Sequence, residues 1–173
     1  MSVLEVIRER GSVRRYEDRS IPKDVLGEVL EAARLAQSAA NRQPWEFVVI
    51  QKEDMKKKLA SASEMFVGEA AAVIVCIAHP ENCGHVGSLN SFLVDVAIAV
   101  ENVALVSWEL GLGSCWIGAY KEDKVRQLLG IPENLRVVSL LSLGYPVEKP
   151  ASQTIRQRRK LLAQIVHYEE YPK

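Results

Sequence analysis

The sequence predicts a single domain in which α-helices and β-strands are combined. Its 173 residues fall within the usual size of one domain, and a hydrophobic fraction of 48% suffices for one core. Segments with apolar residues at helical spacing alternate with short runs rich in β-branched residues. No repeat, low-complexity segment or linker divides the chain, so we expect one domain over residues 1–173.

The first half of the chain is expected to form two helices, a strand, a surface helix and a second strand. Ser2 has the side chain of a helix N-cap, and Pro22 suits the first turn of a helix. The run that ends at Ala78 is apolar throughout, which is typical of a strand buried on both faces. The expected elements are a helix from Ser2 that Gly11 ends, a helix from Pro22 through Ala33, a strand over 47–50, a helix over 52–60 and a strand over 71–78.

The second half is expected to begin with a loop and to continue with a long apolar helix. This helix is apolar on most sides, so we expect it to be covered by the sheet and by a second subunit. The expected elements are a loop over 80–88, a helix over about 91–110 that Gly111 ends, a glycine-flanked segment over 113–120, a small helix over 123–129, a strand over 137–143 and helical spacing over 157–168.

The charge balance and the cysteines exclude several classes of protein. Lys and Arg number 22, as do Asp and Glu, so broad electrostatic binding to nucleic acid or to an anionic membrane is not expected. Acidic residues interrupt the longest apolar tract, so we do not expect it to span a membrane. Three cysteines without a Cys-x-x-Cys pair, and a start without a secretory signal, favour a cytoplasmic location.

Two short basic clusters lie near opposite ends of this neutral chain, at residues 10–15 and 156–160. Guanidinium groups bind phosphate in a bidentate way, and Ser12 adds a hydroxyl donor to the first cluster. Each cluster alone is typical of a solvated surface. A phosphate held by both clusters would explain why they occur as a pair.

Two further stretches have the composition of a ligand site. Residues 36–45 place small and polar residues and a Pro-Trp pair between a helix and a strand, so this loop is expected to contact a ligand. Residues 111–118 resemble a dinucleotide fingerprint, but the third glycine has the wrong spacing and a helix precedes them. Their glycines allow the backbone to approach a planar ligand, with Trp116 as a wall; the alternative is a helix stop followed by a core tryptophan.

Other kinds of site are not expected. Cys76, His79, Cys83 and His85 match no standard zinc spacing, so no metal site is predicted. No Gly-x-Ser-x-Gly motif marks a nucleophile, and Cys115 is interpreted as a small buried hydrophobic residue.

Taken together, four segments resemble motifs of the FMN-dependent nitroreductase family in its short form. They are Arg-Gly-Ser-Val-Arg-Arg-Tyr at 10–16, Ala-Gln-Ser-Ala-Ala-Asn-Arg-Gln-Pro-Trp at 36–45, Gly-Leu-Gly-Ser-Cys-Trp-Ile-Gly at 111–118, and the closing segment at 159–168. Each motif alone is modest, whereas four in the same order are specific and extend over nearly the whole chain.

The resemblance implies an α+β fold with three α/β/α layers, in which helices flank a mixed, mostly antiparallel sheet. It also implies an intertwined homodimer with tightly bound FMN at the subunit interface. By the same resemblance, Arg10, Ser12, Arg14 and Arg159 hold the phosphate and ribityl end, Ser38, Asn41 and Gln43 reach the flavin of the opposite subunit, and the backbone of Cys115, Trp116, Ile117 and Gly118 lines the ring.

The implied function is an NAD(P)H-dependent oxidoreductase with a ping-pong cycle. NADH or NADPH is the diffusible donor, flavin N5 carries the hydride without a catalytic side chain, and the acceptors are nitroaromatics, quinones, flavins or similar small planar molecules. The alternatives are a non-catalytic, regulatory binder of flavin or another phosphate ligand, and a reductive dehalogenase or flavin-consuming enzyme on the same fold.

Three positions depart from the family motifs. Gln37 stands where relatives usually have proline, and Gly11 replaces a second arginine. Glu64 occupies a position where relatives often have an amide facing the flavin, and its charge would repel the reduced ring, so this contact is not carried over. The chain is also too short for the additional helices that cover the ring in larger relatives, which predicts an open site.

Overall fold

A four-stranded antiparallel sheet forms the middle layer of the computed structural model, which describes residues 1–150 and 159–172. The strands are β1 (Trp45–Ile50), β2 (Ala72–Ala78), β5 (Gly113–Ile117) and β6 (Arg136–Gly144), in the order β1-β2-β6-β5. Neighbouring strands of this sheet are antiparallel, and a single bridge between Ser12 and Ser114 adds a parallel pairing. The expected mostly antiparallel sheet is therefore confirmed.

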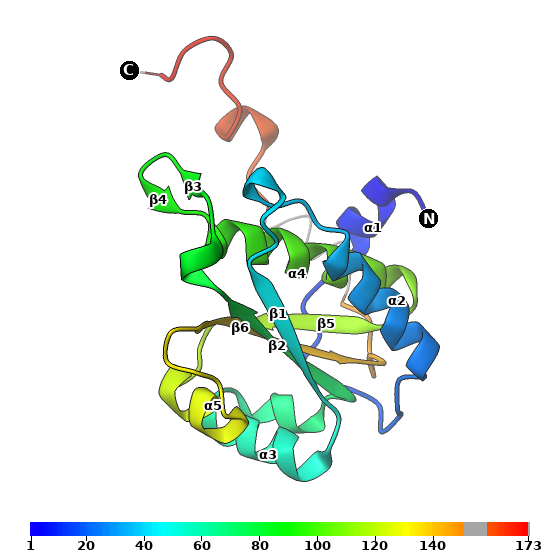
Figure 1. Ribbon diagram of the computed structural model, residues 1–173. Helices are drawn as coiled ribbons and strands as arrows, with labels where there is room; N and C mark the ends of the chain where they lie inside the picture. Colours follow the sequence, from blue (N-terminus) through cyan, green and yellow to red (C-terminus); the bar gives the residue numbers. More distant parts are fainter. Residues whose placement is uncertain (151–158, 173) are drawn as a thin grey trace.

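Helices cover both faces of this sheet (Figure 1). On one side lie α2 (Lys23–Arg34) and α4 (Phe92–Glu109), and α1 (Val3–Glu9) contacts α4. On the other side lie α3 (Glu53–Ala62) and α5 (Glu122–Leu129). The three-layer arrangement and the α+β class agree with the sequence prediction.

Strand β2 shows why the layers form. All seven of its residues are buried, as its apolar composition predicted, and it pairs with β1 on one side and β6 on the other. Successive side chains of a strand point to opposite faces. Accordingly, Val73 and Val75 pack in the core with α3 and α5, whereas Ile74 and Cys76 pack in the core with α2 and α4.

Short 3-10 helices connect these elements. They are η1 (Ala39–Asn41), η2 (Met65–Glu69), η3 (Pro80–Asn82) and η4 (Leu162–Gln164). Ser2 caps α1 as predicted, because its hydroxyl accepts a hydrogen bond from the Glu5 amide and the Glu5 carboxylate accepts one from the Ser2 amide. The helix then ends at Glu9, two residues before the glycine expected to end it.

Two segments contain strands that the sequence pattern did not reveal. The expected loop over 80–88 instead contains β3 (His85–Val86), which forms a small hairpin with β4 (Leu89–Asn90) directly after that range; the hairpin turns at Gly87 with a φ of 61°. The glycine-flanked segment over 113–120 begins with β5. A strand of two residues is too short to show alternation of apolar and polar residues. In β5 the pattern is weak because Gly113 begins the strand and Gly118 follows it directly.

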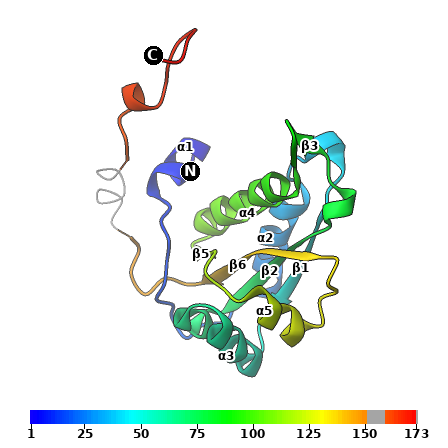
Figure 2. The same cartoon turned by 90° about the vertical axis from the view of Figure 1, so that its left-hand side faces the viewer.

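The C-terminal segment corrects another prediction. Helical spacing over 157–168 suggested a helix, but residues 159–168 form only η4, and positions 157 and 158 lie outside the described residues. Leu161, Leu162 and Ile165 are exposed, so packing against the described residues does not stabilise a longer helix there. The segment extends away from the sheet and its helices (Figures 1 and 2).

Within the part of the chain that the structure describes, none of the helices combines the length and the apolar character needed to span a bilayer. Helix α4 is the longest, with 18 residues, and it carries acidic side chains at Asp95, Glu101 and Glu109.

Candidate functional site

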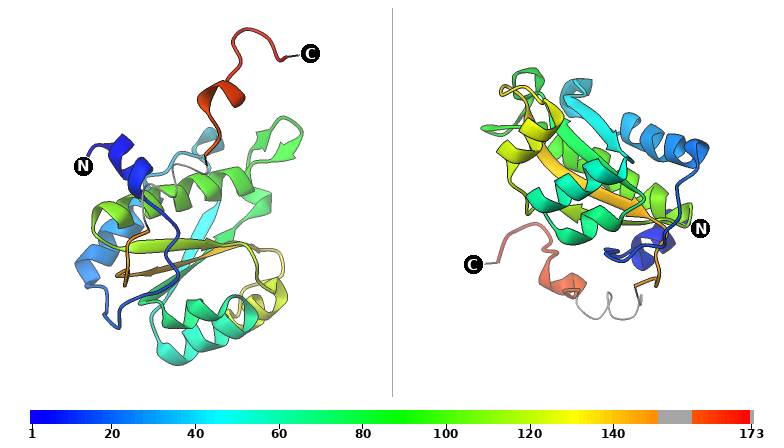
Figure 3. Two further views of the ribbon diagram at one scale, coloured as in Figure 1. Left: turned by 180° about the vertical axis from the view of Figure 1, so that it is seen from behind. Right: turned by 90° about the horizontal axis from the view of Figure 1, so that it is seen from below.

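The segment after α1 crosses to β5 and brings two predicted site residues to the edge of the sheet (Figure 3). The Val13 amide donates a hydrogen bond to the Ser114 carbonyl at 2.9 Å. The buried Tyr16 hydroxyl fixes the end of this segment, since it donates to the Val13 carbonyl and bonds to the Ser142 hydroxyl, each at 2.7 Å. Val13 is buried between Ser12 and Arg14, whose side chains are exposed.

A glycine makes this close approach possible. A Cβ atom added at Gly113 would lie 2.5 Å from Cγ2 of Val13 and 2.7 Å from its Cβ. Because such contacts are too short for real atoms, any larger residue at position 113 would push the segment away from β5. Gly113 therefore positions Ser12 and Arg14.

Strand β5 alternates between buried and outward side chains. Cys115 and Ile117 are buried, whereas Trp116 is 42% exposed. The alternative of a core tryptophan is therefore wrong. Trp116 instead forms part of the wall of a hollow of about 290 Å³, here called the β5 pocket, which is lined by Arg14, Glu64, Phe66, Cys115, Trp116, Ile117, Gly118 and Ala119.

A smaller hollow of about 190 Å³ is also lined by Arg14. This second space, here called the 12–15 hollow, is lined by Ser12, Val13, Arg14, Arg15, Val147, Glu148 and Pro150. Because Arg14 lines both, the two hollows adjoin. The β5 pocket offers two aromatic side chains, strand backbone and the Glu64 carboxylate. The 12–15 hollow offers a hydroxyl, two guanidinium groups and the Glu148 carboxylate.

The cations of the predicted site differ in their partners. The Arg10 guanidinium donates to Glu101 Oε1 through Nε at 3.0 Å and through Nη2 at 2.8 Å. Arg14 forms no ion pair with any described residue. Arg159 is exposed and lines neither hollow, and the other predicted arginines of the C-terminal cluster, 156 and 158, lie outside the described residues.

The protonation of Cys115 follows from its surroundings. Burial raises the pKa of its thiol, and the nearby Arg14 guanidinium and Ser12 hydroxyl oppose this shift. The thiol therefore stays protonated at neutral pH, which agrees with the interpretation of Cys115 as a buried hydrophobic residue.

The remaining predicted residues lie in a different place, in the loop around η1. The Ser38 hydroxyl accepts a hydrogen bond from the Gln43 amide at 2.9 Å, and Gln43 Nε2 donates to the Asn41 carbonyl at 3.1 Å. Asn41 and Gln43 are exposed, and residues of this loop line neither the β5 pocket nor the 12–15 hollow. One chain thus presents the predicted residues as two separate groups.

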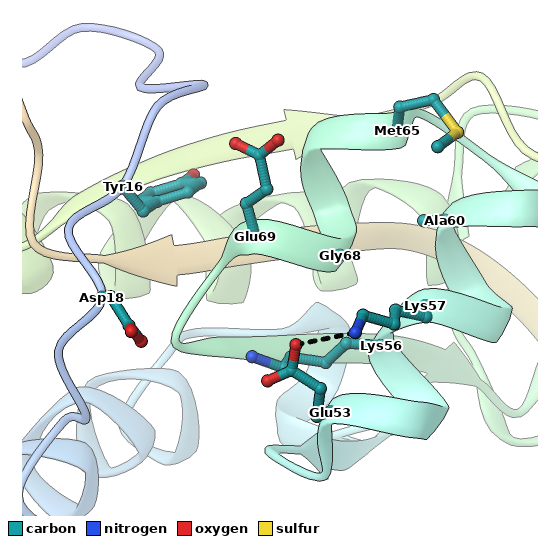
Figure 4. Close-up of a pocket in the computed structure, with 9 residues that line it drawn as sticks. All are labelled: Tyr16, Asp18, Glu53, Lys56, Lys57, Ala60, Met65, Gly68 and Glu69. Carbon is teal, nitrogen blue, oxygen red and sulfur yellow. Dashed lines mark ion pairs between the residues drawn. The ribbon is translucent and has the colours of Figure 1, made fainter.

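A further hollow of about 570 Å³, larger than the β5 pocket and the 12–15 hollow, contains none of the predicted residues (Figure 4). Three carboxylates line it, from Asp18, Glu53 and Glu69. Its two cations are engaged, because Lys57 pairs with Glu53 at 3.1 Å and the buried Lys56 ammonium donates to the Ala70 carbonyl. Such a charge distribution disfavours an anionic ligand.

The structure also brings in residues that the motifs did not single out. Phe66 reaches the β5 pocket because η2 follows α3 and returns the chain to the sheet edge. Asp95 is one of the acidic residues that interrupt the longest apolar tract, and its carboxylate accepts a hydrogen bond from the Ala39 amide at 2.9 Å. The sequence signal that could have identified Asp95 is an acidic residue in the first turn of an otherwise apolar helix.

The residues considered for a metal site are engaged separately. Cys76 is fully buried in β2, and burial raises the pKa of its thiol to about 12. His79 Nε2 lies 2.9 Å from Glu46 Oε1, and the Cys83 thiol donates to the Pro80 carbonyl at 2.9 Å. Within the described ranges, no group of three or more His, Cys, Asp or Glu side chains is arranged to hold a metal ion.

Comparison with known proteins identifies relatives over nearly the whole chain. The model of the nitroreductase family matches residues 7–81 and 64–145. A protein of Archaeoglobus fulgidus, provisionally named an NADH dehydrogenase/NAD(P)H nitroreductase, is 39% identical over 153 residues, which cover 84% of this chain and 86% of the relative. A Methanothermobacter thermautotrophicus protein of the same name is 35% identical over 163 residues, covering 90% of this chain and 83% of the relative.

Solved structures show the same fold. A nitroreductase family protein from Clostridium difficile 630 superimposes with a TM-score of 0.91 at 30% identity, covering 99% of this chain and 100% of that chain. An FMN-dependent nitroreductase from Clostridium difficile R20291 has a TM-score of 0.85 at 27% identity, covering 97% of this chain and 99% of that chain.

Proposed function

This chain belongs to the nitroreductase family, and from that premise we propose that it is an FMN-dependent oxidoreductase that uses NADH or NADPH. We propose further that residues 1–173 act as one flavin-binding domain and that small planar molecules, such as nitroaromatics, quinones or free flavins, are the acceptors. The names of the relatives support the nicotinamide donor, and one neighbouring structure is named as FMN-dependent.

The position of Arg14 carries the proposal. FMN joins a planar ring to a phosphate, so its site needs an apolar surface beside a cationic one. Arg14 lines both the β5 pocket, with Trp116 and the strand backbone, and the 12–15 hollow, with Ser12. The donor set therefore fits a flavin mononucleotide, with Arg14 and Ser12 at the phosphate end and residues 115–118 along the ring.

The residues around the ring have distinct roles in this proposal. When bound, FMN would supply the hydride-transfer chemistry between the nicotinamide and the acceptor. The protonated Cys115 adds no negative charge beside the ring. Trp116 and Phe66 give the pocket aromatic surface suited to planar molecules. Donor and acceptor then use the same space in turn, as a ping-pong cycle requires.

We also propose a homodimer in which the second copy completes each site. Val3, Leu4 and Ile7 of α1 are exposed, and Val3 also lines a largely apolar hollow of about 360 Å³ between α1, α4 and the C-terminal end of α2. The C-terminal segment carries further exposed apolar side chains away from the sheet. Uncovered apolar surface of this kind marks a protein interface. A second copy would also bring its η1 loop to a flavin held on β5.

Anaerobic mixing of the flavin-loaded protein with NADH, and separately with NADPH, tests the proposed function. We expect the oxidised flavin absorbance to bleach with at least one donor and to return when a quinone or nitroaromatic is added. A flavin that stays oxidised with both donors would contradict the enzyme and favour a non-catalytic flavin-binding protein.

A further inference from the structure

Asp95 is a buried carboxylate in the first turn of α4, with 2% of its surface exposed. From its contacts we infer that Asp95 is a positioning residue that holds the η1 loop in the conformation that binds flavin. This inference rests on the proposed function, and it assigns a role to a residue that lies outside both hollows.

Both oxygens of the Asp95 carboxylate are used. Oδ1 accepts a hydrogen bond from the Ala39 amide at 2.9 Å, and Oδ2 accepts one from the Ser91 hydroxyl at 2.7 Å. Asp95 forms no ion pair with any described residue. The amides at the start of α4 favour a negative charge there, but a buried carboxylate without a cation still has a desolvation cost. The hydrogen bonds of the Asp95 carboxylate to Ala39 and Ser91 offset this desolvation cost.

The loop that Asp95 holds has a strained backbone. Ala40, Asn41 and Gln43 have φ values of 51°, 54° and 49°, in the left-handed region that residues other than glycine rarely adopt. Such conformations persist where surrounding contacts determine them, and they are concentrated at functional sites. The amide of Ala39, directly before the first strained residue, is the group that Asp95 binds.

A second contact holds the same point from another side. A Cβ atom added at Gly84 would lie 2.8 Å from the Ala39 Cβ, so the backbone at the base of the β3–β4 hairpin packs tightly against Ala39. The Gly84 carbonyl also accepts a hydrogen bond from the Ser91 amide at 3.0 Å. Ala39 is therefore held between this backbone and the carboxylate, where the loop lies beside the hairpin and the start of α4 (Figure 1).

This arrangement orders the loop before a ligand arrives. Ser38 and Gln43 are joined by a hydrogen bond, and Gln43 is joined to Asn41, so the three polar residues form one unit whose base is tied down at Ala39. A ligand that contacts a preordered loop loses less binding free energy to ordering it. Loss of the Ala39–Asp95 bond should therefore weaken FMN binding without removing any direct contact.

The contacts predict which substitution restores the function. In Asp95→Asn, the amide oxygen can still accept from the Ala39 amide, and the amide nitrogen can donate to the Ser91 hydroxyl. In Asp95→Ala both bonds are lost. The two hydrogen bonds, rather than the negative charge, hold the loop, so Asp95→Asn should keep the FMN affinity that Asp95→Ala loses.

Fluorescence titration of the apoproteins with FMN, well below their melting temperatures, tests this inference. We expect Asp95→Ala to raise the Kd for FMN about 10-fold or more and Asp95→Asn to change it less than about 3-fold. Val103→Ala is the control, because it truncates a buried side chain farther along α4. It should lower the melting temperature and leave the Kd unchanged.

A second readout does not depend on flavin. Arg42 is exposed in the η1 loop, so trypsin cleavage after Arg42 in the apoprotein reports how firmly the loop is held. We expect faster cleavage there in Asp95→Ala than in Asp95→Asn or Val103→Ala. If Asp95→Ala does not fold, Ala39→Pro removes the donor of the same hydrogen bond and should give the same two effects.

An unchanged Kd in a folded Asp95→Ala protein would overturn the inference, whatever the proteolysis shows. A wild-type apoprotein that binds no FMN would instead contradict the proposed function. The two failures are therefore distinguishable.

Discussion

Individual residues of the basic cluster differ in what they offer a ligand. Arg10 already donates two hydrogen bonds to Glu101, whereas Arg14 pairs with no described carboxylate and lines both hollows. The sequence identified both as candidates, but it could not distinguish them, because the partner of Arg10 is 91 residues away on α4. That pairing depends on how α1 and α4 pack, which the sequence does not show. Phosphate binding by Arg10 and by Arg14 therefore remains a prediction for each.

Arg14→Ala is expected to weaken FMN binding about 10- to 100-fold, because a charge-assisted hydrogen bond contributes about 1.5 to 3 kcal/mol. Fluorescence titration of the apoprotein measures this change. Arg34→Ala is a matched control, since Arg34 is exposed on α2 and pairs with Glu31 at 2.6 Å. Equal affinity in the Arg14 and Arg34 variants would contradict the assignment of Arg14.

Cys76 predicts a pH dependence of stability. Burial raises the pKa of its thiol to about 12, above that of an unfolded thiol, and the Ser139 hydroxyl opposes this shift. Its contribution to stability is therefore complete below the unfolded pKa of about 8.5 and is lost as the pH rises towards about 12.

Urea unfolding at pH 8, 9 and 10 checks this expectation. The unfolding free energy of the wild type should fall more steeply with pH than that of Cys76→Ala, by up to about 1.4 kcal/mol per pH unit. Parallel pH profiles for the wild type and Cys76→Ala would contradict this expectation. Cys83→Ala removes a half-buried thiol instead and is the control, whose profile should follow that of the wild type.

At the scale of elements, β5 packs closely against the segment after α1, through the contact of Gly113 with Val13. Gly113→Ala would place a Cβ atom against the buried Val13 side chain, so we expect a loss of about 1 to 3 kcal/mol of stability and weaker FMN binding. Gly27→Ala is the control, because its Cβ atom would meet nothing within 4 Å and alanine favours the α2 helix by about 0.5 to 1 kcal/mol. Chemical unfolding measures both. A stable Gly113→Ala protein with normal flavin affinity would contradict the role of this contact.

The same elements show which parts of the fold could be predicted. The uniformly apolar β2 and the amphipathic α2 were predicted within a few residues, because burial on two faces or on one face leaves a periodic pattern. The small residues of β5 and the two-residue strands of the hairpin leave no such pattern. The C-terminal segment has helical spacing, but a helix needs a surface to pack on, and the described residues of this chain do not provide one.

At the scale of the whole molecule, the predicted site is divided. Four motifs identified the residues, but within one chain Arg14 and Trp116 lie on the β5 edge, while Ser38, Asn41 and Gln43 lie in the η1 loop. The family resemblance implied this separation, because it assigns the loop residues to the flavin of the opposite subunit. Composition and spacing alone could not show it, since it results from the placement of both segments around the sheet. The uncovered apolar surface of α1 and the C-terminal segment supports a second copy as the element that joins the two groups.

A heterodimer with one altered site residue in each chain tests the central claim most directly. Arg14→Ala and Asn41→Ala chains with different affinity tags are coexpressed, the doubly tagged dimer is purified, and its FMN content is measured by absorbance. If each flavin site uses Arg14 from one chain and Asn41 from the other, one site carries both substitutions and the other carries neither. We therefore predict about one FMN per heterodimer and little or none in either altered homodimer. A heterodimer that holds no more flavin than the altered homodimers would show that each site is built within one chain.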